Sequence, residues 1–432
     1  MTSLPSHIGP YEITGLLGRG GMGVVYRATQ KEPLVRAVAL KTIVGGLDAE
    51  EVLARFEAER SVLARMAHPS IANVYDAGMS DDGRPYFAME YVDGQELTRY
   101  CDERRLGIEA RLRLFVQACR AVHHAHQKGI IHRDLKPSNV LVTTVDDAPL
   151  CKLIDFGIAK ATEGTDDERA RLTQSDAVLG TPAYMSPEQI AGRDDIDTRT
   201  DVYALGVLLY ELLSGALPHP PESYRGWAAL ANVLTGEPPA MTERMAAMAD
   251  TQKTVAEARG ASPAELRKRL AGELEWIVAR AMEKEADRRY DAAGTLAEDI
   301  ERHLANEPLL AGPVTAAYRA RKFVRRNRVA VAGAAAVVVA LVGGIVTTSI
   351  NLARAVEAEA SAREEAATAG QVTQYLTELF YAADPGREAG ARMTALDLLD
   401  RGVQQVDRLD DQPVVQARLL SAMGSAYLGL YF

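Results

Sequence analysis

Residues 130–142 read I-I-H-R-D-L-K-P-S-N-V-L-V and place a polar loop between two apolar segments. The loop carries His132, Arg133, Asp134, Lys136 and Asn139. Charged side chains are seldom held between core segments unless they are paired or take part in chemistry. A polar turn between two strands would explain a lone His-Arg-Asp tripeptide. It explains the whole string poorly, because a motif becomes specific only when all of its residues occur together at the expected spacing.

The bulk composition is that of a folded chain with more than one domain. The 432 residues suggest two or three domains, 47% of them are apolar and 25% are charged. A net charge of −10 gives no general case for nucleic-acid binding. The three cysteines are scattered, which indicates reduced thiols of a cytoplasmic compartment and no zinc site. The N-terminus lacks the basic and apolar regions of a cleavable signal peptide.

A glycine turn lies between two β-rich runs within residues 11–28. Gly18, Gly20 and Gly23 are followed directly by Val24 and Val25. Glycine lets the backbone approach phosphate groups closely, so that its N–H groups can face the oxygens. A dinucleotide site is the usual alternative, but its fingerprint needs a helix after the glycines, whereas this sequence continues as a strand. An ordinary glycine hairpin remains the alternative for this segment alone.

Two further charged residues follow apolar strands. Lys41 ends the run A-V-A-L-K, and Asp155 stands in L-C-K-L-I-D-F-G-I-A. A solvent-facing strand end is the commonest place for a lysine. An ionised carboxylate after a buried strand needs a cation or hydrogen-bond donors. The helical pattern of residues 49–67 supplies Glu57 and Glu59 as candidate partners of Lys41.

Together these motifs resemble those of protein kinases, and in particular of bacterial membrane-anchored, eukaryotic-like serine/threonine protein kinases. The resemblance covers about residues 11–305, after an N-terminal extension of residues 1–10. It implies an α+β, two-lobed protein-kinase fold with a small β-rich lobe and a large helical lobe. The departures are Leu40 for isoleucine in V-A-I-K and Ser186 for alanine in A-P-E.

The resemblance also implies a site that uses ATP and Mg²⁺, with Mn²⁺ as a substitute. Asp134 would take the proton of the substrate hydroxyl, Lys136 would offset charge on the transferred group, and Glu59 would hold Lys41, with Glu57 as the second choice. Asn139 and Asp155 would bind the metal. The residues expected around the nucleotide, with Met89 as gatekeeper, are Leu17, Gly18, Arg19, Gly20, Gly21, Met22, Gly23, Val24, Val25, Ala39, Lys41, Met89, Glu90 and Val92.

Residues 155–188 have the form of an activation segment that ends in G-T-P-A-Y-M-S-P-E. Arg133 is the type of residue that pairs with a phosphorylated loop residue. The regulatory phosphoacceptor candidates are Thr173, Ser175 and Thr181, and a merely flexible loop with hydroxyls remains the alternative.

Three other features of the sequence are expected to have structural roles. By resemblance, Asp201 braces the catalytic loop and Arg289 pairs with Glu188. The histidines at 123, 124 and 126 are better explained by the end of a helix than by a metal site. Residues 235–272 are expected to form a surface helical insert.

A basic segment and an apolar segment follow the kinase-like region. Residues 306–328 form a juxtamembrane linker rich in arginine, and residues 329–350 contain no charge, which is long enough for one transmembrane helix. A buried helix is the alternative. The positive-inside rule places residues 1–328 in the cytoplasm and the rest outside, which gives a single-pass protein of the cell inner membrane. The basic residues should also attract anionic membrane lipids.

Residues 351–432 are expected to form an extracytoplasmic helical region, with amphipathic helices at 395–406 and 414–428. The last of these resembles the first helix of a tetratricopeptide-type repeat. A single such repeat cannot bury its apolar face, since about three are needed, so a short helical cap is an equal alternative. Dimerisation and a protein or ligand partner of this tail remain open.

Three functions compete for the kinase-like region. A pseudokinase receptor should have lost Lys41, Asp134, Asn139 or Asp155, and all four are present. A small-molecule phosphotransferase does not need the long activation segment. The sequence therefore predicts a serine/threonine protein kinase that transfers the ATP γ-phosphate to protein substrates, autophosphorylates in its activation loop and signals from a membrane.

Overall fold

The computed structural model describes most of the chain in several stretches. These are residues 4–20, 23–43, 66–156, 182–193, 195–220, 223, 236–248, 251–313, 315–381, 394–406 and 412–430. The predicted residues Gly21, Met22, Glu57, Glu59, Thr173, Ser175 and Thr181 lie outside the described residues. The chain divides into one compact unit of residues 1–327 and a second of residues 328–432.

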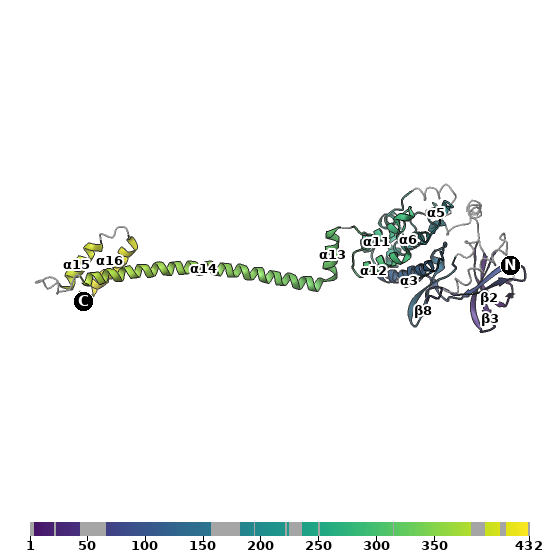
Figure 1. Cartoon of the computed structure of the whole chain (residues 1–432), viewed down its shortest axis with the longest axis horizontal. Helices are drawn as coiled ribbons and strands as arrows, with labels where there is room; N and C mark the ends of the chain where they lie inside the picture. The colour runs from purple at the N-terminus through teal and green to yellow at the C-terminus, as the bar shows by residue number, and fades with distance from the viewer. Residues whose placement is uncertain are drawn as a thin grey trace. The chain divides into compact units, whose positions relative to one another are not determined.

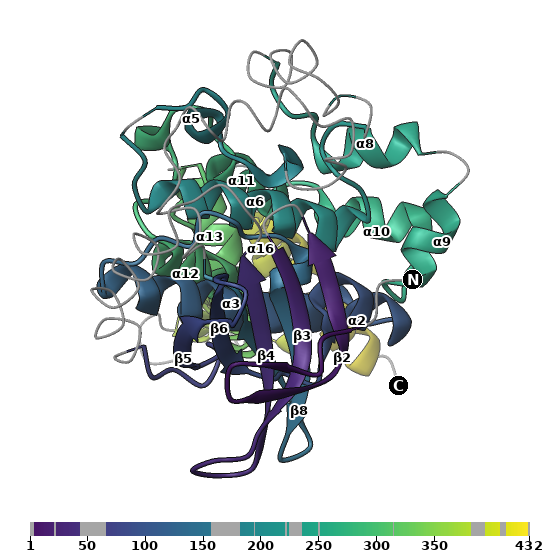
Figure 2. The same ribbon diagram turned by 90° about the vertical axis from the view of Figure 1, so that its right-hand side faces the viewer.

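The small lobe is an antiparallel sheet of six strands in the order β1-β2-β3-β4-β6-β5. Figure 2 shows β2, β3, β4, β6 and β5 side by side. The strands are β1 (His7–Ile8), β2 (Tyr11–Gly20), β3 (Gly23–Gln30), β4 (Arg36–Ile43), β5 (Val74–Met79) and β6 (Pro85–Glu90). The N-terminal extension therefore contributes an edge strand to this sheet.

The two faces of the sheet have different roles because successive side chains of a strand alternate between faces. Val38 and Leu40 of β4 are buried in a cluster with Tyr11, Tyr26 and Ala88. Their neighbours in β4 point to the opposite face, whose buried residues belong to the main core of the large lobe. This second face is the one that carries the predicted nucleotide residues of β4.

A three-stranded sheet and a set of helices form the large lobe. The sheet has the order β7-β8-β9, with β7 (Gln95–Glu96), β8 (Val140–Val145) and β9 (Ala148–Leu153). The helical segments are α2 (Leu97–Glu103), α3 (Ile108–Gln127), η1 (Pro137–Asn139), η2 (Pro182–Tyr184), α5 (Pro187–Ile190), α6 (Arg199–Ser214), α8 (Met241–Ala247), α9 (Gln252–Glu257), α10 (Pro263–Leu270), α11 (Glu273–Ala281), η4 (Ala286–Arg288) and α12 (Ala293–Leu304).

Helix α6 is the centre of the large lobe, and almost every residue in it is buried. A helix that is apolar on all sides needs neighbours on all sides, and α3, α11 and α12 surround it. The helix ends at Gly215, whose φ of 76° is the left-handed conformation that glycine adopts without steric cost.

The described residues of the segment 235–272 form the short helices α8, α9 and α10 at the surface, as expected, and a few of their side chains anchor them on the core. Met241, Met245, Leu266 and Leu270 are buried in the main core. The fully buried guanidinium of Arg259 also donates to the backbone carbonyls of α6 residues 212 and 213, over 2.9 and 2.6 Å. These bonds satisfy carbonyls at the end of α6 that have no partner within the helix.

Helix α13 (Ala316–Arg326) lies within the predicted juxtamembrane linker and belongs to the first compact unit. It contacts the large lobe through Tyr318 and Lys322, both of which reach Glu273 of α11. The kinase-like unit thus extends beyond residue 305 to Asn327.

The second unit consists of α14 (Arg328–Tyr381), α15 (Ala395–Val406) and α16 (Pro413–Leu430). The predicted span and the helix expected after it form one continuous helix, α14 (Figure 1). Among the described residues, α14 is the one helix long and apolar enough to cross a membrane, and its most apolar window is not buried. Helices α15 and α16 pack on the C-terminal end of α14 through Leu379, Val406 and Leu419.

Candidate active site

The catalytic-loop side chains form a compact hydrogen-bonded group. Lys136 Nζ lies 2.8 Å from Asp134 Oδ2, and the side-chain amide of Asn139 donates to the same carboxylate oxygen over 3.2 Å. The amide of Asn139 also donates to the backbone carbonyl of Asp134 over 2.8 Å. The Asp134 side chain is only 13% exposed. The structure therefore brings the predicted base, its neighbouring cation and one predicted metal ligand together.

The loop is held from beneath by Asp201 at the start of α6. The backbone N–H groups of His132 and Arg133 donate to its two carboxylate oxygens over 2.7 and 2.8 Å. His126 of α3 lies 2.7 Å from the same carboxylate. Burial would raise the pKa of Asp201, but the bonds from these partners outweigh it and lower the pKa. The predicted bracing role of Asp201 is confirmed by these contacts.

The end of β9 joins this loop on its other side. The backbone N–H of Ile154 donates to the Asn139 carbonyl over 3.0 Å. The ring of Phe156 packs on the buried ring of His132, with 4.7 Å between their centroids. Burial lowers the pKa of His132, so its imidazole is neutral at pH 7. These contacts fix Asp155 next to the catalytic loop.

Lys41 of β4 contacts Asp155 directly, with its Nζ bonded to both carboxylate oxygens, 2.6 Å from Oδ2. The lysine side chain is 14% exposed and the aspartate side chain 27%. A cation from the small lobe and an anion from the large lobe thus meet at one point. The predicted partner Glu59 lies outside the described residues.

The strand register places the predicted nucleotide residues of β3, β4 and β6 on one face of the small-lobe sheet. Val25 lies opposite Lys41, and Ala39 lies opposite Met89. Residues directly opposite in a sheet share a face, and so do residues two apart in one strand. Val25, Ala39, Lys41 and Met89 therefore share the face that packs on the main core.

The glycine turn joins β2 and β3 and has two kinds of glycine. A Cβ atom at Gly23 would lie 1.9 Å from the carbonyl oxygen of Thr42, so packing against β4 requires glycine there. A Cβ atom at Gly18 or Gly20 would have no neighbour within 4 Å. The protein's own packing does not require glycine at these two positions, so the predicted approach of phosphate to the backbone remains the reason for glycine there.

The predicted nucleotide residues at the end of β6 and just after it differ in their surroundings. Met89 is buried, and Glu90 and Val92 are partly exposed. The carboxylate of Glu90 pairs with Lys152 and accepts hydrogen bonds from Asn73. This carboxylate is occupied, so a contact between Glu90 and a nucleotide would use its backbone. The other predicted turn residues, Leu17, Arg19 and Val24, lie in β2 and β3.

The donor set at this point suits a hard divalent cation. Asp155 carries a carboxylate, which Lys41 pairs in this structure, and Asn139 carries an amide oxygen. Magnesium would replace Lys41 at the carboxylate and complete the set with water and substrate phosphates. Among the described residues there is no cluster of three or more histidine, cysteine, aspartate or glutamate side chains that could hold a metal. The three histidines at the end of α3 have different partners and do not form a common site: His126 binds Asp201, His123 lies by Gln127 and His124 packs on His68.

Comparison with known families decides what this arrangement belongs to. The family model of the protein kinase domain matches residues 11–298. The chain belongs to the protein kinase family. Kinases of this family use ATP and a divalent cation, which agrees with the donor groups described above.

The kinase resembles bacterial serine/threonine protein kinases. It is 44% identical over 237 residues to serine/threonine-protein kinase pkn3 of Myxococcus xanthus, covering 54% of this chain and 42% of that protein. It is 34% identical over 310 residues to PknB of Mycobacterium tuberculosis, covering 70% of this chain and 44% of that protein. The chain therefore spans less than half the length of these curated relatives.

Solved structures agree with the fold. A crystal structure of the PknI kinase domain of Mycobacterium tuberculosis matches with a TM-score of 0.50 and 27% identity, over 70% of this chain and 99% of that one. The predicted two-lobed kinase fold is confirmed. The tetratricopeptide-like character of the tail stays a prediction.

The end of the activation segment is fixed to the large lobe of the kinase. Arg289 donates to both oxygens of Glu188 over 2.7 and 2.8 Å, as predicted, and Thr200 donates to the same carboxylate over 2.7 Å. Burial would raise the pKa of Glu188, but the bonds and charge of Arg289 lower it to about 2. The pair therefore keeps α5 anchored at neutral pH.

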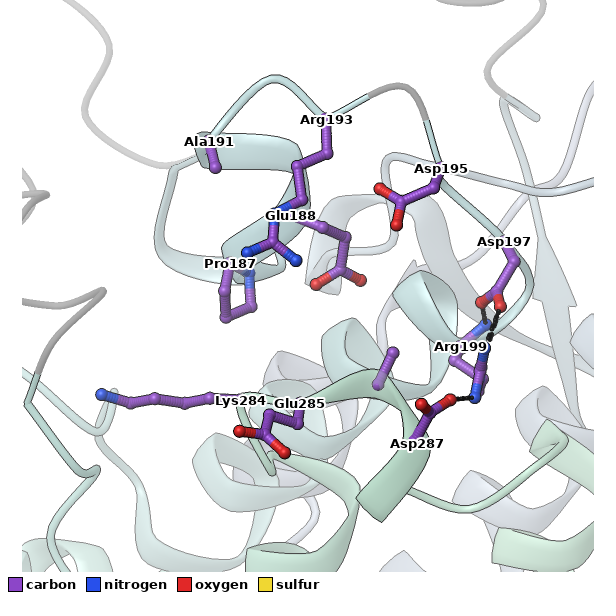
Figure 3. Close-up of a pocket in the computed structure, with 11 residues that line it drawn as sticks. Pro187, Glu188, Ala191, Arg193, Asp195, Asp197, Arg199, Lys284, Glu285 and Asp287 are labelled. Atoms are coloured by element: carbon purple, nitrogen blue, oxygen red, sulfur yellow. Dashed lines mark hydrogen bonds and ion pairs between the residues drawn. The ribbon is translucent and has the colours of Figure 1, made fainter.

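A pocket of about 550 Å³ lies beside this ion pair, between α5 and the segment 284–287 (Figure 3). Within it Arg199 reaches both Asp197 and Asp287. None of the predicted catalytic or nucleotide-binding residues lines the pocket. Its walls carry Glu188 and the ion pairs that Arg199 makes with Asp197 and Asp287.

Sequence reasoning left three site residues unassigned. Tyr184 and Met185 line a small hollow with Asp134 and Lys136. Gln189 donates to the backbone carbonyl of Arg133 over 2.9 Å and so ties α5 to the catalytic loop. All three lie in or directly after the motif that ends the activation segment, but nothing in the motif says that their side chains reach the loop.

Proposed function

We propose that this kinase transfers the γ-phosphate of Mg·ATP to serine and threonine hydroxyls of protein substrates, and that it works while anchored in a membrane. The observation that carries the proposal is the group formed by Asp134, Lys136 and Asn139, next to the Lys41–Asp155 pair. Phosphoryl transfer depends on positioning and on electrostatic stabilisation, so all of these groups are needed together.

Each side chain has a role that follows from its charge and its neighbours. Asp134 orients the substrate hydroxyl and accepts its proton. Lys136, which is bonded to the same carboxylate, offsets negative charge on the transferred group. Asn139 and Asp155 would hold Mg²⁺, which neutralises charge on the phosphates when it is bound. Lys41 would orient the α- and β-phosphates.

Several features support a protein as the acceptor. The family includes kinases named for serine and threonine, such as pkn3 and PknB. The segment end from Pro182 to Ile190 is anchored by Glu188 and Gln189, next to the catalytic loop. Tyr184 and Met185 at Asp134 would then shape a groove for an extended peptide.

Membrane anchoring and regulation complete the proposal. Helix α14 would cross the inner membrane, with the kinase unit in the cytoplasm and the remaining helices outside. Arg133 would pair with a phosphorylated residue among Thr173, Ser175 and Thr181, and so couple autophosphorylation to activity. The tail would bind a protein or a ligand, as the start of a tetratricopeptide-like array. Dimerisation would provide one route to phosphorylation in trans.

A phosphate-transfer assay with the full chain in detergent tests the catalytic proposal. We expect labelled phosphate to appear on serine and threonine of the chain and of added casein, and Asp134→Asn to lower the rate at least about 100-fold through loss of the base. Asp81→Asn, in an exposed turn, is the matched control and should keep the rate. A wild-type chain that binds Mg·ATP without transferring phosphate would instead be a pseudokinase. Full activity of Asp134→Asn would remove Asp134 from its role.

Mapping the phosphate tests the proposed regulation. We expect mass spectrometry of the autophosphorylated chain to find phosphate within residues 160–181. Arg133→Ala should reduce the gain in activity that follows autophosphorylation, because a phosphate in this segment would lose its guanidinium partner. Phosphate found only elsewhere would contradict control by this segment.

A further inference from the structure

Helix α13 docks on the large lobe through a narrow stripe of polar side chains. Tyr318, Lys322 and Arg326 are spaced by four residues and so lie on one side of the helix. Lys322 Nζ lies 2.7 Å from Glu273 Oε2, and Arg326 Nη1 lies 3.0 Å from Glu307 Oε1. The phenol of Tyr318 donates to Glu273 over 3.3 Å and its ring meets the edge of Trp276.

The Glu273 carboxylate is the centre of this contact. His303 of α12 lies 2.7 Å from the same oxygen that binds Lys322. Lys322 is 5% exposed, although lysine is among the residues that are least often buried. Burial would raise the pKa of Glu273, but the bonds to His303 and Lys322 lower it to about 2. The helix is therefore held on the lobe by charge.

The opposite side of α13 is apolar and faces outward. The residues on that side are Ala316, Ala317, Ala320, Phe323 and Val324, and all five are exposed. Phe323 is 57% exposed and Val324 46%. A helix on the surface of a soluble domain buries its apolar stripe and exposes its charges. Helix α13 leaves its apolar stripe exposed and instead packs the Lys322 side of the helix on the lobe, so the apolar stripe needs a partner outside the lobe.

Arginines border this apolar side. Arg319 and Arg321 lie on its two edges, and Arg325 lies nearer the polar stripe. All three are exposed and make no ion pair with any residue that the structure describes. One residue, Asn327, separates α13 from α14, which begins with Arg328 and continues into the candidate membrane span. An apolar stripe with a cationic border, followed at once by a span, is the pattern of a helix in a membrane interface.

We propose that α13 is an interfacial helix whose apolar side enters the cytoplasmic membrane surface, while its polar side holds the large lobe of the kinase. The proposal rests on the membrane anchoring proposed above. The arginines would bind the phosphate groups of anionic lipids, and each contact is worth about five-fold in membrane affinity. The lobe would then have a fixed orientation relative to the membrane, and would not swing on a free linker.

Fluorescent labels on single introduced cysteines test this placement in the full chain. The three native cysteines are buried, and burial raises the pKa of each thiol, so a mild thiol label should leave them unmodified. The label is placed at Phe323→Cys in α13, at Val338→Cys within the span, or at Val145→Cys at the exposed end of β8. Each labelled chain is reconstituted into vesicles of phosphatidylcholine and phosphatidylglycerol with brominated acyl chains.

We expect bromine to quench the labels at positions 323 and 338 and to leave the label at 145 bright. Quenching at 338 without quenching at 323 would overturn the interfacial helix and leave the membrane anchor intact. If position 338 is not quenched, the anchor itself fails and the interfacial helix fails with it. Quenching at all three positions would show that the whole lobe enters the lipid, which also contradicts the proposal.

The lipid charge provides an independent test. Replacing Arg319, Arg321 and Arg325 together by glutamine should weaken quenching at position 323, and so should vesicles of phosphatidylcholine alone. The label at 338 should not respond to either change, because the span inserts through its apolar residues. Quenching at 323 that is indifferent to both changes would refute lipid recognition by the arginines.

Discussion

Glycine serves two purposes in the turn between β2 and β3, and the two can be separated by mutation. Gly23 packs against the backbone of Thr42, where a Cβ atom would lie 1.9 Å from the carbonyl oxygen. We expect Gly23→Ala to destabilise the small lobe by about 1–3 kcal/mol, because the strands must move apart. Gly18→Ala adds a Cβ atom in open space, so the melting temperature should stay the same.

ATP binding should depend on Gly18, although replacing this glycine leaves the stability unchanged. Gly18→Ala should weaken ATP binding about ten-fold, or about 1.4 kcal/mol, because the added methyl group occupies the space proposed for phosphate. Thermal unfolding and titration with a fluorescent ATP analogue measure the two effects. A stable Gly18→Ala variant with unchanged ATP affinity would remove the phosphate role of this glycine.

The ion pair of Glu188 and Arg289 predicts a defined loss of stability in acid. The pKa of Glu188 falls from about 4.5 unfolded to about 2 folded, so the paired carboxylate stabilises the fold above about pH 5 by about 3 kcal/mol. This contribution decreases as the pH falls through the folded pKa. Glu188→Gln should be less stable than the wild type at pH 7, since Arg289 then lacks a buried anion.

Denaturant unfolding of the full chain in detergent, from pH 7 down to pH 2, measures this difference. The stability gap between the wild type and Glu188→Gln should narrow steadily below pH 5, because protonation removes the charge that the variant lacks. Glu265→Gln, on the exposed side of α10, is a control that should follow the wild-type curve. A gap that does not depend on pH would contradict the assigned titration.

The sequence predicted which side chains lie together where a motif is contiguous. Asp134, Lys136 and Asn139 lie within six residues, so their spacing alone indicates that their side chains can meet. The contact from Gln189 to the Arg133 carbonyl joins residues 56 positions apart, and that from His126 to Asp201 joins residues 75 apart. Such contacts depend on how helices pack, which no local pattern encodes.

At the scale of elements, the catalytic loop depends on one buried carboxylate at the start of α6. Asp201 accepts hydrogen bonds from the backbone N–H groups of His132 and Arg133, and it also contacts the imidazole of His126. Asp201→Asn has a single acceptor oxygen and an amide that cannot accept, so one loop N–H must lose its partner. We expect the loop to shift and kcat to fall about 100-fold.

The affinity for ATP should change little in this variant, because Asp201 does not contact the nucleotide face of the small lobe. Steady-state kinetics give kcat and the KM for ATP separately. Asp197→Asn, near the same end of α6 but paired with Arg199, is the control and should keep kcat. An Asp201→Asn variant with a raised KM and an unchanged kcat would show that the carboxylate serves nucleotide binding instead.

Helices were predicted correctly where the apolar residues of the sequence pattern are the ones that the fold buries. The two tail helices were expected within two residues of their observed bounds. The span and the helix after it were expected as separate elements, because the composition changes from apolar to Ala- and Glu-rich near residue 351. Both compositions favour helix and no breaker lies between them, so the backbone continues as one helix, α14.

The sequence did not show how the segment 235–272 is anchored. Its charged and Met-rich sequence predicts a surface segment, and the packing buries Arg259 with a few methionine and leucine side chains. Removing the guanidinium from water is unfavourable, and its hydrogen bonds to the carbonyls at the end of α6 offset this cost. A buried arginine of this kind cannot be told from an exposed one by its sequence context.

For the whole molecule, the decisive question is on which side of a membrane each compact unit lies. The basic run ends at Arg328, where the uncharged part of α14 begins, and glutamates follow that part. This asymmetry predicts the kinase unit inside and the helices α15 and α16 outside. An impermeant maleimide applied to right-side-out spheroplasts can test this, since the native cysteines are buried.

We expect Leu428→Cys in α16, a position that is 66% exposed, to react in intact spheroplasts. Val145→Cys in the kinase unit, 46% exposed, should react only after the spheroplasts are lysed. Both positions lie on the surface of their own unit, so the difference reports the membrane and not the fold. If both positions react only after lysis, α14 does not cross the membrane, and the kinase would have to reach its substrates without an anchor.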